Sequence, residues 1–267
     1  MKSAAFKIAA PEWVPPGNLR FFESHAKLYW ARLHAHHVSG TWEKTVQLHT
    51  ESVARMHLDP NQVGKPSIMR VDLPFSIGLL IGDCLHNMRG ALDYLVSRLA
   101  RDANISDHSI LFPFNKTRSS LEASFDGNGQ RRRAKDFEKL VRDYPNLGDV
   151  ILNRIMPYSE GDGANPSGDL IWRINDANNI DKHRLITPVM RAVHMPMAKF
   201  KGGVTVNDLH WLGEFPDGME VEDHRDLAFD ILFEKPTLLA TKPVTNTLVQ
   251  ACDAVETAIG IFESEFP

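Results

Sequence analysis

The stretch from Ser76 to Arg101 constrains the fold more than any other part of the sequence. Its apolar residues recur at spacings of three and four, the period of one helix face. Arg98 and Arg101 lie near its carboxyl end, where positive charge complements the helix dipole. A continuous apolar stripe of this length has to be buried against other elements. The sequence therefore predicts a long amphipathic helix within a helical core.

Helical spacing also predicts a helix from about Asn18 to His37, which Ser39-Gly40 would end, and a closing helix from about Val244 to Glu263. Between them, two shorter helices are expected at Ala134–Tyr144 and Asn146–Met156, because Pro145 separates two apolar-periodic runs.

After a loop over 157–166, Ser167 is expected to cap a further helix that has Asp169 in its first turn and runs to about Lys182. Runs of β-type residues, broken by Gly, Pro and Asp, predict strands. They are Lys44–Thr50, Ser67–Leu73, Leu185–Met195, Val204–Val206, Leu209–Leu212, Met219–Val221 and Leu227–Phe233. The later runs have short connections, which favours an antiparallel meander. We expect an α+β fold, a mainly helical bundle with an antiparallel β-sheet packed against it, as a single domain over 18–267 after an irregular arm at 1–17.

Composition excludes some classes of function. A formal charge of −4 gives no global basic footprint for nucleic acid. The first residues contain no continuous apolar region, and no apolar stretch has the length of a membrane span. Cys84 and Cys252, both within apolar-periodic stretches, are expected to be buried free thiols, so we place the protein in the cytoplasm. Common nucleotide-binding, zinc-peptidase and hydrolase motifs are not found.

A polar band runs along the long helix opposite its apolar stripe. Lys and Glu, which usually fill a solvated face, do not occur between Ile77 and Ser97. Short side chains of specific geometry indicate a fixed polar network instead, which can specify packing or line a site. The band consists of Asp83, His86, Asn87, Arg89, Gly90, Asp93, Tyr94 and Ser97.

A second helix is unusually rich in Asn and Asp, which are poor residues for a helix interior because they compete for backbone hydrogen bonds. If Leu170 and Ile174 face the core, Asp181 lies on nearly the same side. A carboxylate there needs a partner such as Arg89, His86 or a metal ion, unless this helix end is frayed and solvated.

Two motifs resemble those of a family of uncharacterised bacterial and phage-associated proteins. They are the run from Gly82 to Leu95 (GDCLHNMRGALDYL), together with Met156-Pro157-Tyr158, and the run from Asn179 to Arg184 (NIDKHR). A more distant similarity is to HEPN domains, helical bundles in which an Arg and a His five positions later serve RNA cleavage or nucleotide binding. Arg89 matches that arginine, whereas Tyr94 stands where the histidine would be.

Metal binding is a separate possibility. Asp83 with His86 on one helix and Asp181 with His183 on another would supply two carboxylates and two imidazoles, to which His25 could add a fifth ligand. Against this, Asp181 and His183 are two positions apart, so a regular helix would point them to different sides. A second histidine-rich spot, His34 with its neighbours, is more typical of a helix end.

Three hypotheses for function follow. The first, implied by the resemblance, is a HEPN-like RNA- or nucleotide-binding protein, for which the same resemblance implies a ribonuclease-type role in phage defence and a homodimer. The second is a non-catalytic binding or assembly module in which the polar helices specify packing. The third is a metal-binding helical bundle. In the HEPN-like hypothesis, Arg89 binds phosphate and His86 is the acid or base. Asp181 and His183 complete the catalytic set, and Asp83, Asn87, Asp93, Tyr94 and Asn179 bind or orient. No cofactor is expected.

Overall fold

The computed structural model describes residues 9–14, 19–56, 74–105, 110–125, 132–159, 165–184, 189–199, 205–211 and 228–267. Of these, 46–56, 132–136, 183–184, 189–199, 205–211 and 228–230 are described by their backbone alone.

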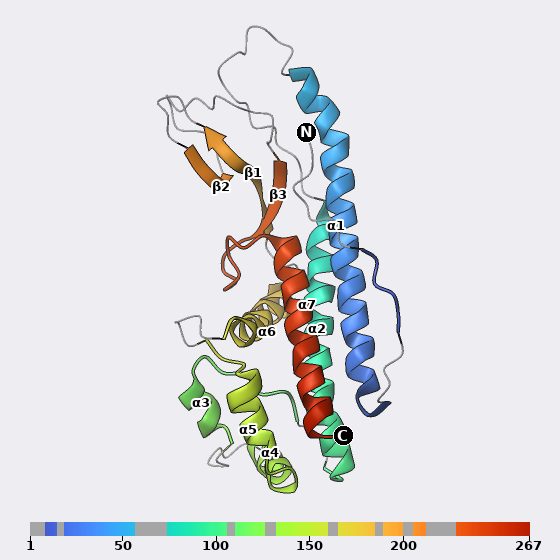
Figure 1. Cartoon of the computed structure of the whole chain (residues 1–267), viewed down its shortest axis with the longest axis vertical. Helices are drawn as coiled ribbons and strands as arrows, with labels where there is room; N and C mark the ends of the chain where they lie inside the picture. Colours follow the sequence, from blue (N-terminus) through green and yellow to red (C-terminus); the bar gives the residue numbers. More distant parts are fainter. Residues whose placement is uncertain are drawn as a thin grey trace.

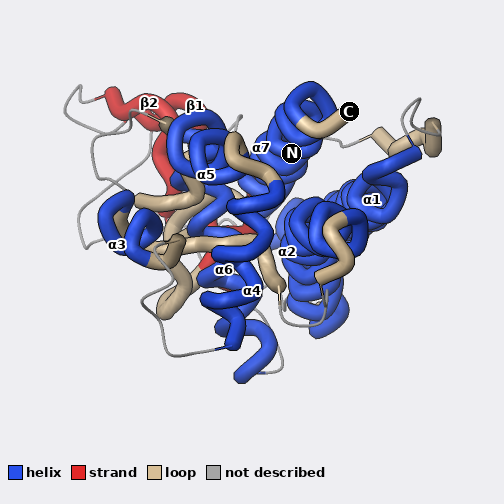
Figure 2. Tube along the Cα trace, turned by 90° about the horizontal axis from the view of Figure 1, so that it is seen from below, coloured by secondary structure: helices blue, strands red, loops and turns tan. Residues whose placement is uncertain are grey.

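Three long helices run side by side along the molecule (Figure 1). They are α1 (Phe22–Met56), which follows a single 3₁₀ turn, η1 (Leu19–Phe21), then α2 (Phe75–Asp102) and α7 (Val244–Glu265). The expected helices over 76–101 and 244–263 are therefore confirmed. In the end-on view of Figure 2, α1 lies on one side of α2, and α4, α5 and α6 lie on the other.

The apolar stripe of α2 is the centre of the core. Ile81, Leu85, Met88, Leu92 and Leu95 are fully buried. The helices α1, α6 and α7 all pack against α2, so its stripe is covered from several directions.

Shorter helices cover one flank of the bundle. They are α3 (Arg118–Ala123), α4 (Arg132–Asp143), α5 (Leu147–Asp149), the π-helix η4 (Val150–Ile155) and α6 (Pro166–Arg184). Ser167 does not cap α6. Instead, the side chain of Asn165 accepts a hydrogen bond of 3.2 Å from the backbone N–H of Gly168. Pro166 then takes the first helical position, where its missing N–H costs nothing.

The N-terminal helix is much longer than its sequence pattern predicts. Ser39-Gly40 does not end it, and the predicted strand Lys44–Thr50 is helical. Val38, Trp42 and Thr45 are buried at spacings of four and three, so burial of one helix face prevails over the short alternation of Val46 and Leu48. The predicted strand Ser67–Leu73 lies outside the described residues.

The predicted α+β class, with a sheet as a layer against the bundle, is wrong, because the chain is mostly helical. In the described chain, strands form only a small antiparallel unit at one end of the bundle (Figure 1), which meets the helices mainly through β3 and α7. Its strands are β1 (Val189–Lys199), β2 (Thr205–Trp211) and β3 (Ala228–Phe233).

The strand order also differs from the expected meander. It is β2-β1-β3, so the third strand pairs with the first. The runs 204–206 and 209–212, predicted as two strands, belong to the single strand β2, whereas 219–221 lies outside the described residues. The long connection over 212–227 gives the chain enough length to return to the far edge of β1.

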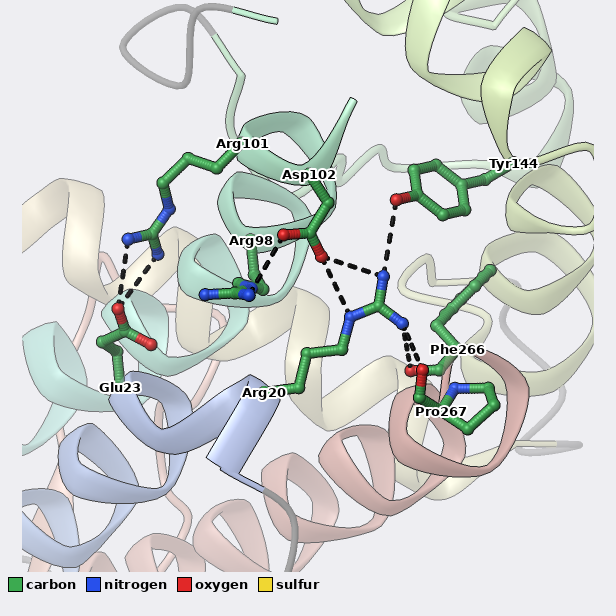
Figure 3. A network of polar contacts seen from close by, with 8 residues as sticks. All are labelled: Arg20, Glu23, Arg98, Arg101, Asp102, Tyr144, Phe266 and Pro267. Carbon is green, nitrogen blue, oxygen red and sulfur yellow. Dashed lines mark hydrogen bonds and ion pairs between the residues drawn. The ribbon is translucent and has the colours of Figure 1, made fainter. Parts of the chain in front are cut away.

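One arginine joins several elements at the lower end of the bundle (Figure 3). The Nε of Arg20 donates to the carboxylate of Asp102 at 3.0 Å, and its Nη1 donates to the carbonyl oxygen of Phe266 at 2.9 Å. Its Nη2 lies 3.4 Å from the hydroxyl of Tyr144. These contacts hold the start of α1 to the ends of α2 and α7.

Gly82 of α2 leaves room for the side chain of Asp181 of α6. A Cβ at Gly82 would lie 2.6 Å from both carboxylate oxygens of Asp181. We expect Gly82→Ala to lower the free energy of unfolding by about 1–3 kcal/mol, because the added methyl group would displace the Asp181 carboxylate from its place against α2. Urea unfolding of the variant measures this loss.

Gly260→Ala is the matched control, because nothing lies within 4 Å of a Cβ there. That variant should gain roughly 0.5–1 kcal/mol from helix propensity. In an Asp181→Ala background, the loss caused by Gly82→Ala should shrink. An equal loss in both backgrounds would contradict the close contact.

Candidate functional site

The polar band of α2 divides between two neighbours. On the side of α1, the side-chain oxygen of Asn87 accepts from the ammonium of Lys27 at 3.1 Å. The Asn87 amide also donates to the backbone carbonyl oxygen of Asp83 at 2.8 Å. Asp83 acts electrostatically on His34 of α1. These residues therefore belong to the contact between α1 and α2.

On the other side, Arg89 and Asp93 hold the extended segment 110–114. They form an ion pair of 2.8 Å one helical turn apart, with side chains only 9% and 23% exposed. Arg89 donates to the carbonyl oxygen of Phe112 at 3.1 Å, and Asp93 accepts from the N–H of Phe112 at 2.8 Å. One ion pair thus satisfies both backbone groups of a residue whose ring is buried.

Aromatic rings complete this arrangement. The guanidinium carbon of Arg89 lies 4.1 Å from the ring centre of Phe114, a cation–π distance. The ring of Phe112 packs against the rings of Phe114 and Phe262, with centres 5.1 and 6.2 Å away. Burial of Phe112 therefore anchors the 110–114 segment to both α2 and α7.

Burial disfavours both charges of the pair. Desolvation raises the pKa of the Asp93 carboxyl, although Arg89 and the Phe112 amide act in the opposite direction. Desolvation likewise lowers the pKa of Arg89, against the attraction of Asp93. Removing either partner would leave the other charge buried and uncompensated.

Two predicted site residues of α2 remain accessible. His86 and Tyr94 are exposed. His86 and Lys182, which follows on α6, both lie close enough to Asp93 to lower the pKa of its carboxyl. The seam between α2 and α6 therefore has two basic side chains beside the buried ion pair.

The predicted residues of α6 do not join Arg89. The carboxylate of Asp181 lies against Gly82, and neither Arg89 nor His86 is hydrogen-bonded to Asp181 in the described structure. Asn179 is exposed, and the side chain of His183 lies outside the described part. A partnership of Asp181 with Arg89 or His86 therefore stays a prediction.

The neighbouring Asn178 was not singled out as a site residue, yet it is only 1% exposed. Both polar atoms of its amide lack a hydrogen-bond partner in the described structure. Burying such an amide costs free energy unless a water molecule or another group satisfies it.

Other histidine and arginine pairs of the sequence form contacts between helices. His25 pairs with Glu263 at 2.8 Å, and Arg32 with Asp253 and Glu256 at 3.0 and 2.8 Å. Glu256 raises the pKa of Arg32, and Arg32 lowers that of Glu256. Over the described residues, no three His, Cys, Asp or Glu side chains gather as a metal site would require.

The two cysteines are free and buried, as expected. Cys84 on α2 contacts Cys252 on α7, and its thiol donates to the carbonyl oxygen of Ala31 at 3.1 Å. The Cys252 contact and burial raise the pKa of the Cys84 thiol well above its usual value. The thiol form that results is a poor nucleophile.

A pocket of about 580 Å³ lies between α6 and α7, apart from the polar band of α2. Sequence reasoning missed it, because its residues come from three separate segments. A weak signal was Thr247, a polar residue within the apolar stripe of α7. The lining residues are Ser159, Pro166, Ser167, Asp169, Leu170, Arg173, Leu239, Lys242, Thr247, Gln250, Asp253, Ala254 and Thr257.

No family model matches the sequence, and no curated protein or solved structure is significantly similar to it. Among the helices of the described chain, none combines the length and apolar character that crossing a bilayer requires.

The buried ion pair should matter for stability. We expect Arg89→Ala to lower the free energy of unfolding by about 3–5 kcal/mol, because Asp93 would keep a buried charge without its partner. Asp93→Asn should cost less, since an amide oxygen can still accept from the Phe112 N–H. Chemical unfolding measures both, with exposed Arg142→Ala on α4 as the control. A loss below about 1 kcal/mol for Arg89→Ala would exclude a structural role of this size.

His34 should make folding sensitive to acid. Burial lowers the pKa of its imidazole below 6.5, Asp83 opposes this, and His37 adds to it. The unfolded chain therefore takes up a proton first, so this contribution to stability is complete above about pH 6.5 and is lost as the pH falls towards the folded pKa. Melting curves at pH 8.0 and 5.5 should differ less for His34→Gln than for the wild type. The control is His86→Gln, which removes an exposed imidazole. If this variant reduced the difference between the two melting curves as much as His34→Gln does, the assignment to His34 would be contradicted.

Proposed function

We propose that the protein is a non-catalytic binding module in which the polar network of α2 stabilises the fold. The supporting observation is that the Arg89 guanidinium is buried among three partners within the chain: the Asp93 carboxylate, the Phe112 carbonyl oxygen and the Phe114 ring. An arginine that recognises phosphate presents its N–H groups to the ligand, usually in pairs. Here Arg89 directs them at backbone and carboxylate.

The position of the proposed acid or base also favours this function. Catalysis by His86 would require a nearby group to hold the phosphate or to orient the imidazole. Arg89 is committed to Phe112, and Asp181 is not hydrogen-bonded to His86. The polar side chains of α2 therefore act on neighbouring segments of the chain rather than converging on one reacting atom.

A second candidate is HEPN-like binding of RNA or nucleotide, and one observation favours it. His86 and Lys182 are exposed and lie beside Asp93 at the seam between α2 and α6. Two basic side chains on neighbouring helices could contact adjacent phosphates of a single strand. In this function, Arg89 would support the seam from within.

A mixed RNA pool distinguishes the two functions. We expect the wild type to leave the RNA uncleaved in a gel assay and to show no binding in a filter assay at physiological salt. His86→Ala and Lys182→Ala should melt within about 1–2 °C of the wild type, as exposed substitutions do. RNA binding or cleavage that is lost in these variants at unchanged melting temperature would replace the first proposal by the second. Exposed Lys139→Ala on α4 is the matched control.

A further inference from the structure

The pocket between α6 and α7 is outside the network of α2 and has three walls. The first half of α6 forms one wall, the turn that ends at Lys242 forms the second, and the first half of α7 forms the third. Its volume of about 580 Å³ is within the range of small-molecule sites, roughly 300–1,000 Å³. Leu170, Leu239 and Ala254 give it apolar surface beside its polar groups.

Most charges on these walls already have partners. Arg173 pairs with Asp169 at 2.6 Å and donates to the carbonyl oxygen of Leu238 at 2.6 Å. Asp253 pairs with Arg32 of α1. Within the part of the chain that the structure describes, no carboxylate pairs with the ammonium of Lys242. The lining as a whole has two carboxylates and two cations, and Lys242 is the cation that has no ion-pair partner within the described chain.

The side chain of Thr247 lines the same pocket. Thr247 is only 5% exposed, and its side chain has no hydrogen-bond partner among the described residues. A polar group at this depth is normally satisfied by protein, water or a ligand. Gln250, one turn further along α7, adds an amide that also lacks a partner within the described chain.

The N-termini of α6 and α7, both near the pocket, differ in how their positive ends are complemented. At α6, the Asn165 side chain and Asp169 already complement the positive end of the helix. At α7, Pro243 precedes the first turn, no side chain caps it, and the first turn contains no acidic residue. Lys242 and Thr247 flank this uncapped start. Negative charge is therefore favoured at the α7 wall.

We propose that this pocket binds a small organic anion, whose acidic group lies at Lys242 and Thr247 and whose body contacts Leu170, Leu239 and Ala254. Gln250 would donate or accept a further hydrogen bond. The proposal names the ligand class of the binding module and rests on that function. The failure of one proposal can be told from the failure of the other. RNA cleavage would contradict the non-catalytic function, whereas anion binding to the pocket could still be measured.

Thermal shift with three defined anions tests the proposal, each against a neutral analogue of similar shape. The pairs are benzoate with benzamide, succinate with succinamide and adenosine monophosphate with adenosine, at equal ionic strength. We expect at least one anion to raise the melting temperature in a saturable way, with its neutral partner inactive. Titration calorimetry then gives its dissociation constant. Lack of a shift with all three anions, or an equal shift with the neutral partner, would overturn the proposal.

Substitutions locate the site. Lys242→Gln and Thr247→Val should each weaken the anion at least tenfold, whereas Lys139→Gln on α4 removes the same charge far from the pocket and should leave affinity unchanged. Thr247→Val keeps the shape of the side chain, and without ligand it should melt close to the wild type, because the Thr247 hydroxyl has no hydrogen-bond partner within the described chain. Unchanged affinity in the Lys242→Gln, Thr247→Val double variant would place the anion elsewhere and refute the site.

Discussion

The apolar face of α2 has to be covered from several sides, and the positions of α1, α6 and α7 follow from that need. Each fully buried Leu, Ile or Met contributes about 1.5–3 kcal/mol relative to an exposed one. The stripe extends along a helix of 28 residues, and α1, α6 and α7 all pack against that helix. Helices remote in sequence therefore meet along it, and the segment 110–114 closes the remaining side through Phe112.

Polar groups then determine how these elements are placed on α2. Gly82 lets the carboxylate of Asp181 approach the helix backbone, which sets the position of α6. Arg89 and Asp93 hold both backbone groups of Phe112, which sets the path of the chain from α2 towards α3. Hydrophobic burial is non-directional, whereas these contacts require defined geometry. The short polar side chains of α2 thus specify arrangement, and the apolar ones supply most of the free energy.

The sequence predicts α2 and α7 well, because their apolar stripes are long and regular. It misplaces the end of α1, where buried Trp42 and Thr45 continue a helical face through a run with strand-like alternation. The residue types of α2 predict a polar network, but they do not predict the partner of Arg89. That partner is the backbone of Phe112, and because every residue has a backbone carbonyl group, the sequence cannot indicate which one accepts the hydrogen bond. The pocket was missed for a related reason. That Lys242 has no ion-pair partner becomes evident only once Arg173 is seen to pair with Asp169 and Asp253 with Arg32.

The helix α1 is held both by apolar packing and by ion pairs, of which Glu23 with Arg101 joins it to α2. Its buried apolar residues include Leu28, Ala31, Ala35 and Val38, and the carbonyl oxygen of Ala31 contacts Cys84 of α2. Towards α7 it uses ion pairs, and the Asp253 and Glu256 side chains that meet Arg32 are 63% and 54% exposed. Dissolved salt screens exposed charges but leaves apolar packing intact or strengthens it. Ionic strength therefore acts differently on the two kinds of contact: concentrated salt weakens the ion pairs of Arg32 between α1 and α7, while the apolar packing that both helices make with α2 is retained.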